Sequence, residues 1–185
     1  MEHPNLMDLS YKQAIESAMD GLLLDPAIKF VGYGLLKGKN GCGLRNVPDD
    51  RIAEFTVAES LMTSAAIGMS LCGIKPVVLI ERADFIWNAM DAIVNHLDAC
   101  ETISKGEFRP TAIIRVIVGN KRGPLFTGHT HTQHNAEAVK RAVRFPVWCP
   151  CSAEQVLTAY ATALDNLKNH STIIYEEKDR TLGYL

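Results

Sequence analysis

Short, largely apolar runs alternate with longer amphipathic stretches along most of this chain. The runs are bounded by glycine, proline or charged residues, a length and setting typical of buried parallel strands. The longer stretches carry apolar residues every three or four positions, which predicts helices. Strands that alternate with helices predict an α/β fold, a three-layer α/β/α arrangement around a mainly parallel sheet. The main strands are predicted at 51–57, 76–80, 111–118 and 172–176.

The helix boundaries follow from capping residues. Ser10 precedes the first amphipathic stretch in the position of an N-cap, and Gly73 follows another in the usual C-terminal position. The stretch that ends before Gly73 is apolar nearly all round, which predicts burial on several sides. The predicted helices are 11–24, 59–72, 84–103, 135–144 and 152–168, and shorter strands are predicted at 29–32 and 146–149.

Composition narrows the class of protein. A chain of 185 residues fits one domain, and a net charge of −2 disfavours a nucleic-acid partner. No apolar run reaches the roughly 18–20 residues that span a bilayer, and residues 1–10 lack the apolar core of a signal peptide. Five cysteines without framework spacing predict a reducing compartment. We therefore expect a cytoplasmic protein that binds neither nucleic acid nor membrane.

A carboxylate and an aromatic ring follow two of the predicted strands. Glu59 comes just after the strand at 51–57, and Phe85 just after the strand at 76–80, 26 positions later. In open α/β sheets, ligands bind at the carboxyl edge of the strands. The pair can grip a flat heteroaromatic ring, one residue by a hydrogen bond and the other by stacking. Taken alone, Glu59 could be a helix-start acid and Phe85 a core residue.

Histidines gather in the segment that follows the strand at 111–118. His129, His131 and His134 precede Cys149 and Cys151, but the spacing matches no common zinc pattern. Two further interpretations remain open, solvated loop histidines and a histidine that orients substrate or transfers protons. Because this segment leaves the same sheet edge as Glu59 and Phe85, the last interpretation is the most specific.

Five glycines lie between Gly32 and Gly43. The segment lacks the Gly-Lys-Ser/Thr ending of a phosphate-binding loop, and it does not lead straight into a helix as a dinucleotide fingerprint does. It is predicted to be a flexible loop at an active site or an interface.

The block from 58 to 96 resembles a known family. The chain is similar, over about residues 9–177, to the pyrimidine-binding, transketolase-like domain of the beta subunit of thiamine-diphosphate-dependent pyruvate and branched-chain 2-oxo acid dehydrogenases. Weaker support comes from 131–133, which is similar to the family's His-Ser-Gln. The strongest segments are 58–60, 65–69, 76–78, 83–86 and 91–96.

The resemblance implies roles for four residues. Glu59 would hydrogen-bond the pyrimidine ring nitrogen of thiamine diphosphate, which favours the tautomer that removes the thiazolium proton. Phe85 would stack on the pyrimidine, and Val57 would complete the cofactor-binding set. His131 would line the substrate side as a second catalytic residue beside Glu59. The cofactor supplies the carbanion chemistry and the protein supplies orientation.

The resemblance also implies a partner. The family holds the diphosphate and its Mg²⁺ through a Gly-Asp-Gly motif, and no Gly-Asp-Gly occurs in this sequence. We therefore expect residues 1–185 to form a single pyrimidine-binding domain, without a diphosphate-binding or C-terminal transketolase domain and without a metal of its own. The expected partner is an alpha-type subunit that carries Gly-Asp-Gly, with two copies of each chain in a heterotetramer.

The expected reaction is decarboxylation of a small 2-oxo acid and transfer of the resulting acyl or carbanion unit. Two alternatives stay open. One is a subunit of a split transketolase-like or acyloin-synthase-like enzyme, and the other is a non-catalytic subunit that stabilises or regulates a partner.

Overall fold

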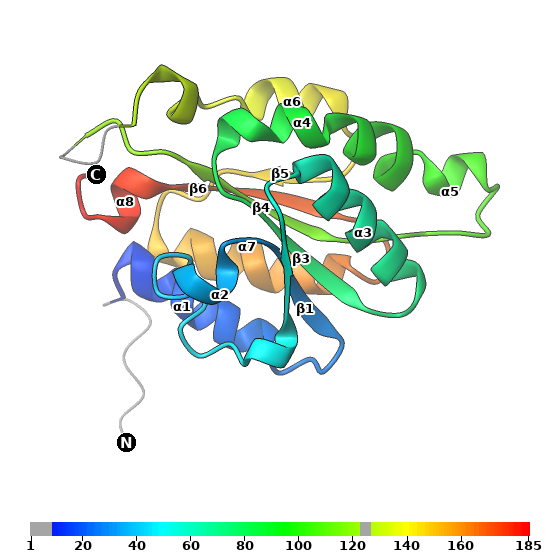
Figure 1. Ribbon diagram of the computed structural model, residues 1–185, viewed down its shortest axis with the longest axis horizontal. Helices are drawn as coiled ribbons and strands as arrows, with labels where there is room; N and C mark the ends of the chain where they lie inside the picture. Colours follow the sequence, from blue (N-terminus) through cyan, green and yellow to red (C-terminus); the bar gives the residue numbers. More distant parts are fainter. Residues whose placement is uncertain (1–8, 123–126) are drawn as a thin grey trace.

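The computed structural model describes residues 9–122 and 127–185, which form a six-stranded sheet with helices on both faces (Figure 1). Every pair of neighbouring strands is parallel, in the order β2-β1-β3-β4-β6-β5. The predicted three-layer α/β fold is therefore confirmed. The strands are β1 (Ile28–Tyr33), β2 (Ile52–Phe55), β3 (Lys75–Ile80), β4 (Ile113–Val118), β5 (Val147–Trp148) and β6 (Thr172–Glu177).

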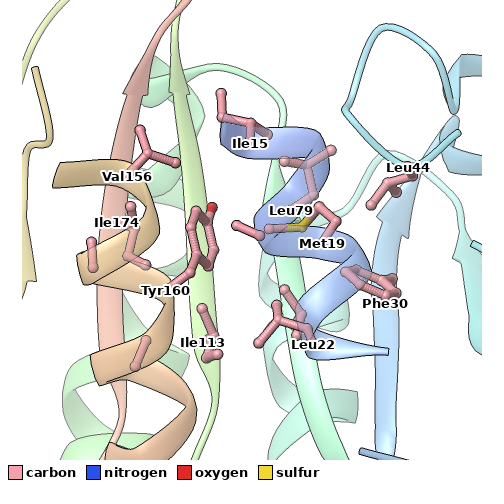
Figure 2. Packing of buried hydrophobic residues seen from close by; sticks show 14 of the residues in the cluster. Ile15, Met19, Leu22, Phe30, Leu44, Leu79, Ile113, Val156, Tyr160 and Ile174 are labelled. Carbon is pink, nitrogen blue, oxygen red and sulfur yellow. The ribbon is translucent and has the colours of Figure 1, made fainter. Parts of the chain in front are cut away.

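Two helix layers cover the sheet. On one face, α1 (Tyr11–Leu22) packs against α7 (Ala153–Asn166), and apolar side chains from both helices meet those of the strands. Figure 2 shows Met19 and Leu22 of α1 across from Tyr160 of α7, with Ile113 behind them. The opposite face carries α3 (Glu59–Leu71), α4 (Ile86–Asp91) and α6 (Ala136–Ala142).

The first helix begins as its sequence predicts. The Ser10 side chain accepts a hydrogen bond from the backbone of Gln13, and the Gln13 side chain accepts one from the backbone of Ser10. This reciprocal capping box satisfies two of the free N–H groups at the helix start. The helix ends at Leu22, slightly before the predicted end at residue 24.

The segment predicted as one helix over 84–103 is divided. A 3₁₀ turn, η3 (Ala83–Phe85), leads into α4, which continues as a π-helical stretch, η4 (Ala92–Asp98), and ends in α5 (Cys100–Ile103). A π-helical turn holds an extra residue, so it rotates the side chains that follow it. Ile93 and Leu97 of this stretch remain buried against the sheet.

The glycine-rich segment is more ordered than predicted. It contains a short helix, α2 (Leu35–Gly38), whose start is capped by a carboxylate from the neighbouring strand β2. The Glu54 side chain accepts hydrogen bonds from the backbone N–H groups of Gly34 and Leu36. Gly34 has a φ of 68°, a left-handed conformation that glycine adopts at little cost.

Two further short helices, η2 (Asp49–Arg51) and α8 (Lys178–Thr181), were not predicted from the sequence.

The helix predicted to be buried on several sides is covered on one face only in this chain. Met62, Thr63 and Ala66 of α3 are buried against the sheet and α4. The opposite stripe is exposed and consists of small and apolar residues, because positions 61, 64, 68 and 71 lie on one side of the helix. We call this stripe, Leu61, Ser64, Gly68 and Leu71, the open face of α3.

Strand β4 carries an arginine in the middle of its apolar run. Arg115 is 1% exposed and makes two hydrogen bonds of 3.0 Å with the two carboxylate oxygens of Glu176 on β6. Its Nε also donates to the hydroxyl of Tyr160 at 2.9 Å, and Nη2 donates to the carbonyl of Cys42 at 3.0 Å. Burial alone would lower the pKa of Arg115, but the charge of Glu176, the neighbouring Tyr160 and the hydrogen bonding to Glu176 together raise this pKa, so the guanidinium stays charged.

Candidate functional site

Glu59 lies at the start of α3, close to where β2 ends at the carboxyl edge of the sheet. Its side chain is only 7% exposed. The one hydrogen bond to this carboxylate within the described residues comes from Nδ2 of Asn88 on α4, at a long 3.5 Å. The first turn of α3 places its positive dipole end beside the acid. Glu59 is therefore a nearly buried carboxylate with acceptor capacity left over.

Phe85 and His131 are in direct contact. Phe85 ends η3, which follows β3, and His131 ends η5 (His129–His131) in the segment after β4. Their ring centroids are 5.3 Å apart and the ring planes meet at 81°. In this edge-to-face arrangement the edge of one ring meets the face of the other. The structure thus brings together two site residues that are 46 positions apart in the sequence.

Hydrogen bonds between side chains and backbone groups hold the segment after β4 against η3. We call this segment, which contains His129, His131 and His134, the histidine segment. The side chain of Asp84 accepts a hydrogen bond from the backbone N–H of Gln133 at 3.3 Å, and Nδ2 of Asn135 donates to the carbonyl of Ala83 at 2.7 Å. Asn135 in turn accepts a hydrogen bond from the Tyr175 hydroxyl at 2.8 Å. These bonds tie the segment after β4 to the end of β3 and to β6.

Val57 lies between β2 and α3 and is 59% exposed. An apolar side chain exposed at the carboxyl edge of the sheet is available for contact with a ligand or another chain. All four predicted site residues, Val57, Glu59, Phe85 and His131, therefore follow the carboxyl ends of β2, β3 or β4. This edge of a parallel sheet is where ligands bind in α/β folds.

Among the histidines that were considered for zinc, His134 has an environment different from that of His131. The His134 ring stacks on Tyr175, with centroids 5.6 Å apart, and its Nε2 lies 4.0 Å from the carboxylate of Glu177. Cys149 and Cys151 are exposed. Across residues 9–122 and 127–185, no three or more His, Cys, Asp or Glu side chains are grouped as a metal site.

The sequence analysis did not single out Asn88, Asp84 or Asn135 as site residues. Asn88 follows Phe85 by one helical turn, so its position opposite Glu59 could have been inferred from helical spacing once α4 was placed. Asp84 contacts Gln133, which is 49 positions away, and Asn135 contacts Ala83 and Tyr175, which are 52 and 40 positions away. Local sequence carries no signal for such contacts.

Comparison with known proteins decides the family. A model of the transketolase pyrimidine-binding domain matches residues 8–181. The chain belongs to this family. The fold described above is thus that of a transketolase-type pyrimidine-binding domain.

Curated relatives of this pyrimidine-binding domain are beta subunits. The chain is 31% identical to the 2-oxoisovalerate dehydrogenase subunit beta of Pseudomonas aeruginosa over 128 residues, which is 65% of this chain and 35% of that protein. It is 25% identical to the mitochondrial pyruvate dehydrogenase E1 component subunit beta-1 of Oryza sativa over 183 residues, which is 95% of this chain and 47% of that protein. The chain thus spans a third to a half of these relatives.

Solved structures agree with the fold at lower sequence identity. A structure described as a split gene transketolase, inactive beta4 tetramer, superposes with a TM-score of 0.67 at 18% identity, over 92% of this chain and 52% of that chain. A putative thiamin diphosphate-dependent enzyme from Mycobacterium smegmatis superposes with a TM-score of 0.62 at 16% identity, over 91% of this chain and 31% of that chain. Among the residues that the structure describes, no helix has the length and apolar character needed to cross a membrane.

Proposed function

We propose that this chain is the pyrimidine-binding half of a thiamine-diphosphate-dependent enzyme that decarboxylates a small 2-oxo acid and transfers the resulting unit. The observation that carries the proposal is the placement of Glu59, Phe85 and His131 at one edge of the sheet. The relatives named as dehydrogenase beta subunits support the 2-oxo acid as substrate.

The residues present fit the pyrimidine ring of this cofactor. The Glu59 carboxyl group is nearly buried and has only one long hydrogen bond, so it is available for a further hydrogen bond that shares a proton with a ring nitrogen. Phe85 is half-buried and packs against His131, which leaves the remainder of its ring for a stacked partner. When bound, thiamine diphosphate supplies a carbanion-stabilising centre for cleavage beside a carbonyl group.

Glu59 has a defined task in this proposal. Held at the start of α3 beside Asn88, its carboxyl group fixes the orientation of the pyrimidine and shares a proton with the ring nitrogen. Burial strengthens that hydrogen bond, because water does not compete for the carboxylate. Val57, exposed on the same edge, adds apolar contact.

His131 is assigned to the substrate side. Its Nδ1 lies 3.1 Å from the Thr130 hydroxyl, and its ring contacts Phe85 edge-to-face. A ring held in this way can donate or accept a proton at Nε2 while its orientation stays fixed.

The other half of the site must come from outside these 185 residues. The sequence contains no Gly-Asp-Gly, so the diphosphate and Mg²⁺ are assigned to an alpha-type partner that carries this motif. The open face of α3 is a surface on which such an assembly can be built, because apolar and small side chains allow close helix packing. An assembly with two copies of each chain would place each cofactor between subunits.

Co-purification and reconstitution test the proposal. This chain should bind thiamine diphosphate weakly alone and tightly when mixed with a Gly-Asp-Gly partner, as measured by calorimetry. The complex should then release CO₂ from pyruvate or branched-chain 2-oxo acids. Submicromolar binding by the isolated chain would contradict the split site. Transfer of two-carbon units from ketose phosphates, with no CO₂ release, would instead assign a transketolase-like activity.

A further inference from the structure

A charged cavity lies at the point where the order of the strands reverses. The chain runs from β1 outward to β2 and then crosses back to β3, so the carboxyl ends of β1 and β3 flank the topological switch point. A cavity of about 200 Å³ is formed there by Gly38–Gly43, which follow β1, and by Glu81 and Arg82, which follow β3. Switch points are the places where open α/β sheets bind ligands.

The cavity is distinct from the cofactor half-site proposed above. Val57, Glu59, Phe85 and His131 do not line it. It opens on the side of the sheet covered by α1, which contributes Lys12 and Ile15, whereas α3 and α4 cover the other side. Arg82, three positions before Phe85, lies between the two regions.

The charges that face the cavity are not balanced. Lys12, Arg82 and Lys178 line it together with Glu81 and Glu176. Both carboxylate oxygens of Glu176 already accept hydrogen bonds from the buried guanidinium of Arg115. This ion pair neutralises the negative charge of Glu176. Arg82 Nη1 lies 3.4 Å from the Glu81 carboxylate, so these two charges offset each other, and Lys12 and Lys178 leave the cavity with an excess of positive charge.

The lining cations retain unused donor capacity. Lys178 Nζ donates to the backbone carbonyl of Gly41 at 3.2 Å, a contact that leaves two of its three protons. Lys12 Nζ lies 3.9 Å from Glu16, beyond a hydrogen bond. Nε of Arg82 is buried without an acceptor among the described residues. A buried donor without a partner is costly, and such a group commonly marks a place for an ion or ligand.

We infer that this cavity binds a small oxyanion, a carboxylate or a phosphate, between the glycine-rich segment and the lysines of α1 and α8. Because one water occupies about 30 Å³ of liquid, the cavity has room for roughly six or seven non-hydrogen atoms. Inorganic phosphate and a three-carbon 2-oxo acid both have this size. The inference gives the glycine-rich segment a role, and it does not depend on thiamine diphosphate.

Titration calorimetry with hydrogen exchange can test the site. Inorganic phosphate and pyruvate are each titrated into the full chain at constant ionic strength, set with sodium chloride. We expect saturable binding of at least one of them and slower amide exchange in residues 38–43. Phosphate binding alone would identify a phosphate site, and pyruvate binding alone a carboxylate site.

Three variants locate the binding. Lys178→Gln and Lys12→Gln should each weaken binding about tenfold, since each removes a charge-assisted contact. Lys140→Gln on α6, across the sheet, is the matched control and should bind as the parent does. Lys12 makes no bond to the glycine-rich segment, so its variant separates loss of the anion contact from loosening of that segment.

The inference is overturned by any of three results. One is the absence of saturable binding up to about 10 mM of either anion. Another is binding without protection of residues 38–43. The third is an equal loss of affinity in Lys140→Gln, which would indicate non-specific attraction to the protein surface.

Discussion

Gly119 lies directly against the carbonyl oxygen of His131. A methyl group added at Gly119 would come within 1.8 Å of that oxygen, so no side chain fits there without movement of the backbone. Gly119 follows β4 immediately, and His131 ends η5. This close approach fixes how near the histidine segment comes to the sheet.

The first prediction concerns this contact. Gly119→Ala should lower the free energy of unfolding by about 1–3 kcal/mol, because the backbone of the histidine segment must shift. The reconstituted enzyme should also lose activity, since His131 moves relative to Phe85. Gly21→Ala in α1 is the matched control. A methyl group there meets nothing within 4 Å, so this change should leave stability unchanged or raise it by up to about 1 kcal/mol. Chemical denaturation compares the two, and equal stabilities would contradict the prediction.

The second prediction rests on the proposed function. Glu59→Gln should fold and assemble normally, because an amide fills the same space beside Asn88. In the reconstituted enzyme, the exchange of the thiazolium proton with deuterated solvent should slow by about 10²–10⁴, the usual range for loss of an acid–base group. The exposed residue Glu107 provides a control, and Glu107→Gln should exchange at the parent rate. Parent-like exchange in Glu59→Gln would remove this residue from the mechanism.

The third prediction concerns the buried ion pair. Arg115→Met should lower the free energy of unfolding by about 3–5 kcal/mol, because it leaves the Glu176 carboxylate buried and unpaired. Adding Glu176→Gln to that variant should restore much of the loss. The amide is neutral and can still accept the hydrogen bond from Tyr160. Urea denaturation of the single and double variants measures the coupling. A double variant less stable than Arg115→Met would show that the charge of Glu176 is not the cause.

The fourth prediction concerns alkaline pH. Burial raises the pKa of Tyr175 well above its usual value near 10. The unfolded chain therefore loses this proton first as the pH rises. The stability from neutral Tyr175 is complete below pH 10 and decreases above it, by about 1.4 kcal/mol per pH unit. Tyr175→Phe should remove this part of the slope. Denaturation curves measured between pH 9 and 11 for the parent chain and Tyr175→Phe should show the difference in slope.

The fifth prediction concerns the open face of α3. Obligate interfaces bury about 2,000 Å² or more and are dominated by apolar side chains. The isolated chain should therefore self-associate at micromolar concentration in sedimentation experiments. Leu61→Lys should shift it towards monomer, because a charge in the centre of such a contact is costly. Leu24→Lys is the control, since Leu24 is 87% exposed but lies outside α3. A parent chain that sediments as a clean monomer would defeat the prediction.

The sequence predicts the sheet well for a physical reason. Buried parallel strands need apolar side chains on both faces, and the run at 76–80, which became most of β3, is continuous in this respect. Boundaries are less accurate where polar contacts set them. The strand predicted over 51–57 is limited to β2 (Ile52–Phe55), because η2 (Asp49–Arg51) precedes it and the chain turns towards Val57 after it.

The candidate site was predictable in outline only. The carboxyl-edge rule was enough to place Glu59 and Phe85 at the same edge of the sheet, because it depends on strand order and direction alone. The contact between Phe85 and His131 depends on the path of a long segment, which local pattern does not determine. The pairing of Arg115 with Glu176 was also hidden, because it requires the register of β4 against β6.

The two outer strands of the sheet are its shortest, with four residues in β2 and two in β5. An outer strand has unpaired N–H and C=O groups to which a strand of another chain can hydrogen-bond, so that the sheet is extended. Short outer strands offer few such groups. Copies of this protein therefore have little backbone with which to join edge to edge into fibres. Association is left to side chains on the helical layers, where the choice of partner can be encoded residue by residue.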